Sequence, residues 1–454
     1  MAMKRYNKVF IFTLFRRNAS VRFNIIFIIS SVEGKQRHFL RAGAVGVTLY
    51  HRITTPTHTL KGYAADNIAV YYGYDRNSAT HSLTHSTGSG SEPCLVPIGH
   101  FDSDNLLDIA VANFGANNII IIFEYENRSS ANETVFSTES SSVVWIQVID
   151  LKNDSITDLV TANYATHSVS VILGFGNEIF ASPSTYSTRF YSFPSMVVSG
   201  DFNGDKRMSL AIANYGTNNV GIMLGNGKGI FGTQKRLSTG PNSHPYSIAL
   251  SDLNNDFILD IVVANYENKS IGVFLGKDNG TFTNQTVYSL NSASLYSIGI
   301  SDFNKDNSMD TIATNNGTNN VGILLGYGNG SFPSSIMYLT GSSSSISIAI
   351  CDLNKDNRLD MVLINNDTNR IDILLGYDEG LPMQTKYTTG SDPNYVVVRD
   401  FKNDTVVDIA TTNRYSNTIS IFLGYRTDFL QQKLTLSLTK LLPLVLPWTL
   451  ITIE

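Results

Sequence analysis

Short apolar runs alternate with polar loops through most of the chain, and their order repeats. In one representative stretch the runs are YSIALS from Tyr246, DIVVAN from Asp260, SIGVFLG from Ser270 and QTVYSL from Gln285. Each run is rich in β-branched or aromatic residues and is bounded by Asn, Asp, Gly or Ser, which is typical of strands. No window of helical period competes with them. The pattern therefore predicts a repeated unit of four short β-strands.

An acidic motif between the first and second predicted strands marks each unit. It reads HFDSD, DLKND, DFNGD, DLNND, DFNKD, DLNKD and DFKND, and its copies begin at positions 100, 150, 201, 252, 302, 352 and 400. An asparagine follows every start by thirteen residues, and a glycine follows six of them by twenty-four. About fifty residues and four strands per unit are typical of a β-propeller blade. We therefore expect an all-β, seven-bladed β-propeller of four-stranded blades; a parallel β-helix, whose coils are usually shorter, is the main alternative.

Two further strand patterns, NIAVYYG from Asn67 and HSLTH from His81, precede the first motif, whereas TISIFLG from Thr418 has no clear fourth strand behind it. We expect the His81 strand to complete the last blade, because such closure hides an open sheet edge. The Asn67 strand is then left over, with a degenerate eighth blade as one place for it. The predicted organisation is a non-repeat segment (1–62), the propeller (63–429) and an apolar tail (430–454).

Composition narrows the class of protein. Charged residues make up 16% and hydrophobic residues 42% of the 454 residues, which is too apolar for disorder. The net charge of −5 gives no electrostatic footprint for nucleic acid. Two cysteines, Cys94 and Cys351, exclude a disulfide scaffold.

The units SGDFNGD…LAIANYGTNNVGIMLGNGKGIF and SDFNKDNSMDTIATNNGTNNVGILLGYGNGSF resemble FG-GAP/VCBS repeats. They are similar to the blades of the integrin alpha-chain N-terminal β-propeller and of many secreted or surface adhesion-type proteins. The resemblance covers roughly residues 65 to 425. It implies the propeller fold and calcium loops between first and second strands, but it does not select a function, because one fold hosts many functions.

The motif D-x-N-x-D-x-x-x-D carries oxygen at positions one, three, five and nine. Alternate side chains of a tight loop can point inward together, and calcium takes six to eight oxygen ligands. The alternative is that these residues form Asx turns, which accounts for one Asp or Asn per loop rather than three carboxylates converging on one point. We expect Ca²⁺ in the three complete loops, at Asp252, Asn254, Asp256 and Asp260, at Asp302, Asn304, Asp306 and Asp310, and at Asp352, Asn354, Asp356 and Asp360.

The other loops depart from this motif. The loop at Asp201 keeps Asn203 and Asp205 but has Ser209 at position nine, and the first loop keeps Asp102, Asp104 and Asp108 behind a histidine. We include both as weaker calcium sites. The loops at Asp150 and Asp400 place Lys152 and Lys402 at position three, where a lysine ammonium could neutralise the carboxylates in place of an ion.

Other features are interpreted structurally. GNGKG from Gly225 resembles a phosphate loop, but no helix follows it, so a hairpin turn between third and fourth strands is expected. The recurring asparagine, such as Asn265, is expected to cap the turn after the second strand, where Asn tolerates a left-handed backbone. No unrepeated catalytic cluster is visible, so we expect no enzyme.

The functional expectation is a calcium-binding extracellular or cell-surface propeller that acts as an adhesion or protein-ligand binding module. The alternative is a lectin-type propeller with carbohydrate in pockets between blades, for which Tyr164, Tyr215 and Tyr266 are candidates. An enzyme domain is less favoured. Asn-x-Ser/Thr sequons, such as Asn268, are consistent with a secreted glycoprotein. The partner is expected to be a protein or a glycan rather than nucleic acid, with membrane association through apolar stretches at the termini, which resemble a signal peptide or an anchor.

Overall fold

The protein is almost entirely β-structure. The computed structural model describes residues 45–50, 67–73, 81–86, 93–95, 97–102, 108–113, 116–123, 133–138, 142–290, 294–316, 320–333, 335–339, 345–356, 358–365, 367–377, 380–391, 393–399, 406–413, 418–423 and 432–437. One 3₁₀ turn, η1 (Tyr215–Thr217), is the only helical segment among them. No helix in these ranges is long and apolar enough to cross a membrane. The apolar stretches at the two termini, expected to be a signal peptide or an anchor, lie outside these ranges.

Each of the seven acidic motifs belongs to one antiparallel sheet, and the four predicted strands are present in each. The first strands are β4 (Pro93–Leu95) with β5 (Ile98–Gly99), β9 (Val143–Ile149), β15 (Pro194–Gly200), β19 (Pro245–Ser251), β25 (Ser294–Ser301), β29 (Ser345–Cys351) and β33 (Pro393–Arg399). The second strands are β6 (Asp108–Asn113), β10 (Asp158–Asn163), β16 (Ser209–Asn214), β20 (Asp260–Asn265), β26 (Asp310–Asn316), β30 (Asp360–Asn365) and β34 (Asp408–Asn413).

The third and fourth strands complete these sheets. The third strands are β7 (Asn118–Ile122), β11 (Ser168–Ile172), β17 (Asn219–Met223), β21 (Ser270–Phe274), β27 (Asn320–Leu324), β31 (Arg370–Tyr377) and β35 (Thr418–Leu423). The fourth strands are β8 (Glu133–Ser137), β14 (Ser184–Ser187), β18 (Lys235–Ser238), β24 (Thr286–Ser289), β28 (Ile336–Leu339), β32 (Gly380–Thr388) and β36 (Gln432–Ser437). Two units add small hairpins between these strands, made by β12 (Gly174–Gly176) with β13 (Ile179–Phe180) and by β22 (Gly276–Lys277) with β23 (Thr281–Phe282).

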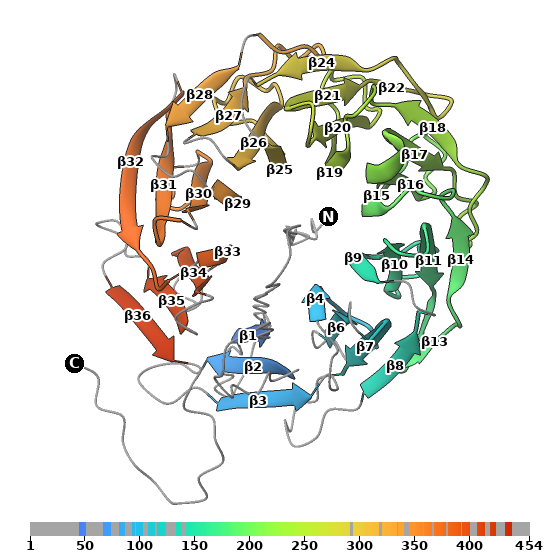
Figure 1. Ribbon diagram of the computed structural model, residues 1–454, viewed down its shortest axis with the longest axis horizontal. Coiled ribbons are helices and arrows are strands. Elements are labelled where there is room, and N and C mark those ends of the chain that lie inside the picture. Colours follow the sequence, from blue (N-terminus) through green and yellow to red (C-terminus); the bar gives the residue numbers. More distant parts are fainter. Residues whose placement is uncertain are drawn as a thin grey trace, which may run out of the picture.

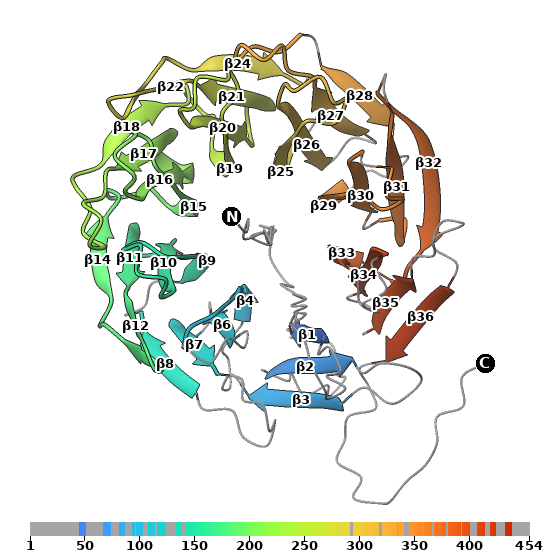
Figure 2. The same cartoon turned by 180° about the vertical axis from the view of Figure 1, so that it is seen from behind.

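The sheets follow one another around a ring, with first strands innermost and fourth strands outermost (Figure 1). The same arrangement is visible from the other side (Figure 2). First strands of adjacent sheets contact each other, as β15 does with β19 and β19 with β25. This is the architecture of a β-propeller, so the predicted fold is confirmed at that level.

The ends of the ring differ from the prediction. The His81 strand does not complete the last sheet: β3 (His81–Ser86) pairs with β2 (Asn67–Gly73), which pairs with β1 (Val45–Tyr50). This three-stranded sheet lies between the β33–β36 sheet and the β4–β8 sheet (Figure 1). The last sheet has its own fourth strand, β36, in the segment expected to be tail. The seven-blade count is therefore not confirmed, because seven motif-bearing sheets share the ring with an eighth sheet.

Burial explains why the four strands of a unit differ in sequence. Every residue of β10, β16, β20 and β30 is buried, because the second strand is covered by a neighbouring sheet on each face. Fourth strands such as β18 and β24 are mostly exposed. This layering explains why the second strand is a nearly continuous apolar run and why the fourth strand is polar.

The turn after the second strand corrects one expectation. Asn214 has an ordinary backbone with φ of −91°, and the left-handed residue is Asn218, with φ of 54°. The buried Asn214 instead donates a hydrogen bond from its Nδ2 to Oδ1 of Asn219 on the third strand, at 2.8 Å. Asn265 makes the corresponding bond to Ser270, at 3.2 Å. The recurring asparagine therefore ties the second strand to the third across the turn.

The recurring glycine marks a close approach between strands. A Cβ atom on Gly276 would collide with the backbone carbonyl oxygen of Leu259, and one on Gly225 would collide with that of Met208. The GNGKG segment that begins at Gly225 is a turn, as expected, in which the Asn226 N–H donates to the Ile230 carbonyl at 3.0 Å. The glycine is thus required by packing between the end of the third strand and the acidic loop.

Substitution of this glycine tests the packing. Gly276→Ala is expected to lower the free energy of unfolding by about 1–3 kcal/mol, because the new methyl group overpacks a backbone contact. Gly232→Ala is the control, since its Cβ would lie 3.6 Å from the nearest atom, the carbonyl oxygen of Leu224. Its effect should stay within about 0.5 kcal/mol. Denaturant titration of both variants measures the difference, and equal effects would contradict the assigned role of Gly276.

Candidate cation sites in the acidic loops

The acidic loops all lie at the same end of their sheets. In the third motif-bearing pair of strands, β15 and β16, Gly200 faces Ser209 at the loop end and Pro194 faces Asn214 at the other end. The pairing of β19 with β20 repeats this register, with Ser251 opposite Asp260. The loops therefore share one face of the ring, and the turns after the second strands share the opposite face.

The ninth-position aspartate is the most buried side chain of each complete loop. Asp260 has no exposed surface, and its two carboxylate oxygens accept separate backbone bonds: Oδ2 from the Leu253 N–H and Oδ1 from the Gly276 N–H, both at 2.8 Å. Asp310 and Asp360 repeat both bonds. One carboxylate thus joins the start of the acidic loop, the second strand and the end of the third strand.

Burial makes the charge of this carboxylate costly. Desolvation raises the pKa of Asp260, Asp310 and Asp360 to about 6 each, although the two N–H bonds lower it. The aspartates at positions five and one of the same loop raise it further through charge repulsion. Each complete loop is therefore an electrostatic environment that favours a nearby positive charge.

The Asx turns that were the alternative to a calcium site are also present in the structure. Asp252 accepts the N–H groups of Asp256 and Phe257, at 3.1 and 2.8 Å, and Asp256 accepts that of Ile258 at 2.8 Å. The amide of Asn254 donates to Oδ2 of Asp256 at 2.9 Å. These bonds shape the loop, so Asx turns and a cation site are not exclusive alternatives here.

The expected convergence of three carboxylates is not seen. Within the described residues, no group of three or more His, Cys, Asp and Glu side chains is close enough to hold a metal ion. The reason is that the Asp260 oxygens are directed to backbone N–H groups, while Asp252 turns toward the amides of its own loop. A cation in this loop would need oxygen from Asn254 and from the backbone as well as from carboxylates.

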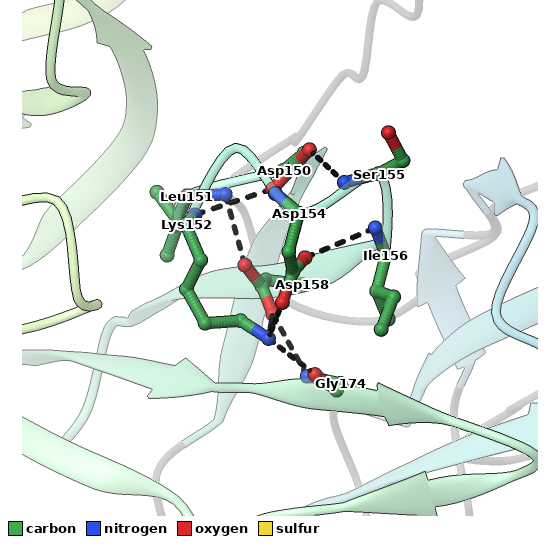
Figure 3. Close-up of polar contacts among 8 residues, drawn as sticks. All are labelled: Asp150, Leu151, Lys152, Asp154, Ser155, Ile156, Asp158 and Gly174. Atoms are coloured by element: carbon green, nitrogen blue, oxygen red, sulfur yellow. Dashed lines mark hydrogen bonds and ion pairs between the residues drawn. The ribbon is translucent and has the colours of Figure 1, made fainter.

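The Asp150 loop contains its own cation, as the sequence indicated (Figure 3). Nζ of Lys152 lies 2.6 Å from Oδ2 of Asp154, 2.6 Å from the Gly174 carbonyl oxygen and 3.7 Å from Oδ1 of Asp158. It also lies 5.3 Å from the centre of the Phe175 ring. Oxygen atoms from the loop, the second strand and the end of the third strand therefore surround one positive charge.

Electrostatics stabilise this charge. Partial burial alone would lower the pKa of Lys152, but the hydrogen bond to Asp154 and the charges of Asp158, Asp154 and Asp150 raise it. Burial raises the pKa of Asp158, and Lys152 opposes that rise. The ammonium group therefore places one positive charge among the oxygen atoms of the Asp150 loop.

Two complete loops have no such internal charge. No ion pair within the described residues involves the aspartates of the Asp252 and Asp302 loops, whereas Arg358 lies 3.9 Å from Asp356 in the Asp352 loop. Oδ1 of Asp302 and Oδ1 of Asn203, in the Asp201 loop, are both buried. Neither accepts a hydrogen bond in the described part of the chain. These free acceptor oxygens fit a cation ligand set.

The incomplete loops are built differently. Ser209 offers one hydroxyl, which accepts the Gly225 N–H at 3.2 Å, so this loop has two carboxylates instead of three. In the first loop Asp108 is buried and accepts the Phe101 N–H at 2.8 Å. Asp104 and the Asp400 loop with Lys402 lie outside the described residues, so predictions that rest on them remain predictions.

The recurring glycine takes part in the acidic loop, which was not expected from the sequence. The Gly174 carbonyl contacts the lysine ammonium and its N–H binds Asp158. The constant distance between motif and glycine was the available signal, but it was interpreted only as a turn. Loop and glycine thus form one structural unit although they are far apart in sequence.

The fold and the repeated loops define a β-propeller built of motif-bearing blades. Residues 201–263, 252–313 and 302–363 match the FG-GAP-like repeat at three consecutive positions. Over residues 201–363 this match confirms the resemblance to FG-GAP repeats inferred from the sequence. No curated protein matches the chain.

Solved structures with low identity share the fold. An Agrocybe aegerita lectin that recognises non-reducing terminal N-acetylglucosamine has 15% identity and a TM-score of 0.51, covering 76% of this chain and 92% of its own. The periplasmic gluconolactonase of Pseudomonas aeruginosa has 12% identity and a TM-score of 0.51, covering 73% and 94%. The V. cholerae biofilm matrix protein Bap1 has 10% identity and a TM-score of 0.51, covering 82% and 81%. Because a lectin and a lactonase both have this fold, the fold alone does not select a function.

The two kinds of aspartate in a complete loop should respond differently to substitution. In the presence of a chelator, Asp260→Ala is expected to cost about 2–4 kcal/mol, because it leaves two buried N–H groups without acceptors. Asp256→Ala removes an exposed carboxylate and should cost less than about 1 kcal/mol under the same conditions. Urea titrations with chelator measure both, and a larger loss for Asp256→Ala would contradict the hierarchy described here.

Proposed function

We propose that the protein is a calcium-stabilised β-propeller that acts as an extracellular or cell-surface binding module in adhesion. The observation that carries the calcium proposal is the Lys152 ammonium, which places a cation among the oxygens of one acidic loop. The Asp252 and Asp302 loops have asparagine at the position of that lysine, together with three aspartates each. An external cation would supply in these loops the charge that Lys152 supplies in the other.

The residues present are those that calcium prefers. Asp252, Asn254 and Asp256 offer oxygen ligands on one loop, and Asp260 contributes a negative charge behind them. A hard cation accepts carboxylate, amide and backbone oxygens together, in a flexible geometry. When bound, the ion would offset the repulsion that raises the pKa of Asp260. The loops would then tie first, second and third strands together with less electrostatic strain.

The distribution of functional side chains around the ring favours a binding role over catalysis. The acidic loops repeat with nearly the same residues around the ring, which suits a structural role for each ion. No arrangement of nucleophile, base and orienting group emerges from the sequence. Propeller enzymes such as the gluconolactonase share the fold, so the absence of catalysis is part of the proposal.

The same chemistry supports the proposal of an extracellular location. Loops with few, flexible ligands bind calcium in the concentration range found outside cells. The sequons at Asn268 and Asn279 lie in exposed turns, where N-glycans can be attached in a secretory compartment. The V. cholerae biofilm matrix protein Bap1 shares the fold, which fits the proposal.

Calcium removal tests the proposal directly. Chelation is expected to lower the melting temperature, because ions that bind only the folded state stabilise it by about 2.7 kcal/mol per site at a hundredfold excess over Kd. Native mass spectrometry should count bound calcium. Unfolding curves that coincide with and without chelator would contradict a structural role for the ion.

Matched substitutions locate the ions. Asp256→Ala should reduce the calcium count by one, whereas Asp154→Ala should leave it unchanged, since Lys152 already occupies that loop. Lys152→Asn should raise the count by one, because it restores the complete motif in a loop that keeps Asp150, Asp154 and Asp158. A drop for Asp154→Ala would show that calcium enters that loop despite the lysine.

A further inference from the structure

The connection between β14 and β15 differs in sequence from the connection between β18 and β19 but has the same backbone conformation. It reads Thr-Arg-Phe-Tyr-Ser-Phe-Pro from Thr188 to Pro194, and the corresponding connection in the next blade reads Thr-Gly-Pro-Asn-Ser-His-Pro from Thr239 to Pro245. The Thr188 and Ser192 hydroxyls are 2.7 Å apart, and the Thr239 and Ser243 hydroxyls are 2.6 Å apart.

Both connections have three left-handed residues at the same places. In the first they are Arg189 (φ 89°), Tyr191 (φ 62°) and Phe193 (φ 45°); in the second they are Gly240 (φ 87°), Asn242 (φ 54°) and His244 (φ 48°). Glycine and asparagine tolerate this region, whereas arginine and aromatic residues are strained in it. The next blade shows that folding alone does not need these side chains. The strain therefore indicates that the Arg189 and Tyr191 side chains serve another purpose.

The aromatic rings of this connection gather at the surface. Phe190 is 69% exposed and Tyr191 is 60% exposed, with ring centres 4.1 Å apart at an angle of 56°. Below them His167 contacts Phe190 at 5.4 Å and Phe193 at 4.5 Å. Tyr164 stacks against Phe193 at 5.0 Å. We call Tyr164, His167, Phe190, Tyr191 and Phe193 the aromatic cluster.

The cluster is held in place by its surroundings. Nδ1 of His167 accepts the Phe193 N–H at 3.3 Å, and burial lowers the pKa of His167. A side chain at Gly216 would collide with the Tyr191 carbonyl and the Phe193 ring. Gly216 stands two residues after Asn214, whereas the residue two positions after Asn265 is Glu267. The exposed rings are thus presented on a fixed base.

A positive charge directly precedes the exposed rings in the chain, at Arg189. Arg189 is exposed, and no ion pair in the described part of the chain involves its guanidinium group. A planar guanidinium binds a carboxylate through two parallel hydrogen bonds. The electron-rich face of an aromatic ring attracts partly positive C–H groups such as those on one face of a sugar ring. Together they define a ligand with an apolar face and a carboxylate.

We propose that the aromatic cluster and Arg189 bind a carboxylate-bearing saccharide, with the sugar ring on Phe190 and Tyr191 and its carboxylate on Arg189. A saccharide is favoured over a protein because two exposed rings on one connection offer far less than the roughly 800 Å² per partner of a stable protein interface. The site deepens the proposed binding role by naming a ligand class. It lies on the face opposite the acidic loops, so it does not depend on their calcium ligands.

The other aromatic stacks do not support a saccharide site. Tyr215, Tyr266 and Tyr296 are half-buried or buried, and they contact each other and Tyr246 across adjacent blades. Tyr215 and Tyr266, singled out as lectin candidates from the sequence, are thus accounted for by packing between blades. The exposed Phe190 and Tyr191 were not singled out, because their connection carries no repeated motif.

The test replaces one connection by the sequence that the next blade uses for the same backbone. The swap variant carries Arg189→Gly, Phe190→Pro, Tyr191→Asn and Phe193→His and keeps Ser192. Full-length protein and variant are applied to an array of glycans that end in N-acetylneuraminic acid or glucuronic acid, beside neutral galactose and glucose. We expect the wild type to bind the acidic glycans, and the swap to weaken binding at least tenfold while the melting temperature stays equal or rises.

A second variant isolates the charge. Arg189→Gln should weaken binding to the acidic glycans at least tenfold and leave the fold intact. Wild-type protein that binds no acidic glycan, or only neutral glycans or an immobilised poly-glutamate peptide, would overturn the proposal. Undiminished binding by the swap variant would also overturn it, as would a marked fall in its melting temperature, which would make the rings structural.

The calcium proposal is assessed separately on the same samples. The calcium count and the chelator-induced shift in melting temperature should be the same for wild type and swap variant, and glycan binding by the folded wild type should persist with chelator at a temperature below its unfolding. Loss of acidic-glycan binding on the swap without any bound calcium would overturn the calcium proposal alone. Bound calcium without glycan binding would overturn the saccharide site alone.

Discussion

The structure depends on a buried carboxylate that six of the seven motif-bearing blades share. The ninth-position aspartate, such as Asp260, accepts one N–H from the start of its loop and one from the glycine at the end of the third strand. The two bonds fix three chain segments at one point, and they also require glycine at that point, because the approach leaves no room for a Cβ atom. The desolvation of a charged group opposes this arrangement, and positive charge nearby offsets it.

This constraint divides the ring into two unlike faces. On one face the acidic loops can use an internal cation, as the loop of Lys152 does, or an external one, as proposed for the loop of Asp252. The other face carries short turns and the connections between blades, whose backbone is set by hydroxyl pairs and left-handed residues. The connections after β14 and β18 share their backbone conformation but differ in their side chains. The strained Arg189 and Tyr191 are found in the first of these connections.

Much of the fold could be predicted from the sequence, because strand residues and loop residues differ sharply in chemistry. The limits of β20 and β2 coincide with the apolar runs at Asp260 and Asn67. The fourth strand β36 was missed because its alternating, partly polar sequence is weak evidence by itself, although it stands at about the same distance from its loop as β18 and β24. The orientation of carboxylates was beyond prediction: residue spacing shows which oxygens can meet, whereas competing backbone N–H groups decide where Asp260 points.

Comparison among blades separates what the fold requires from what it permits. Where the ninth aspartate becomes Ser209, one hydroxyl still accepts the glycine N–H, so the hydrogen bond is retained and the charge is lost. Where the third-position asparagine becomes Lys152, the positive charge becomes part of the chain. Both changes keep the loop and alter only its electrostatics. The Arg-Phe-Tyr connection is the reverse case, because its backbone matches that of the next blade while its side chains oppose that backbone. Changes that relieve a constraint point to stability, and a change that adds strain at an exposed site points to recognition.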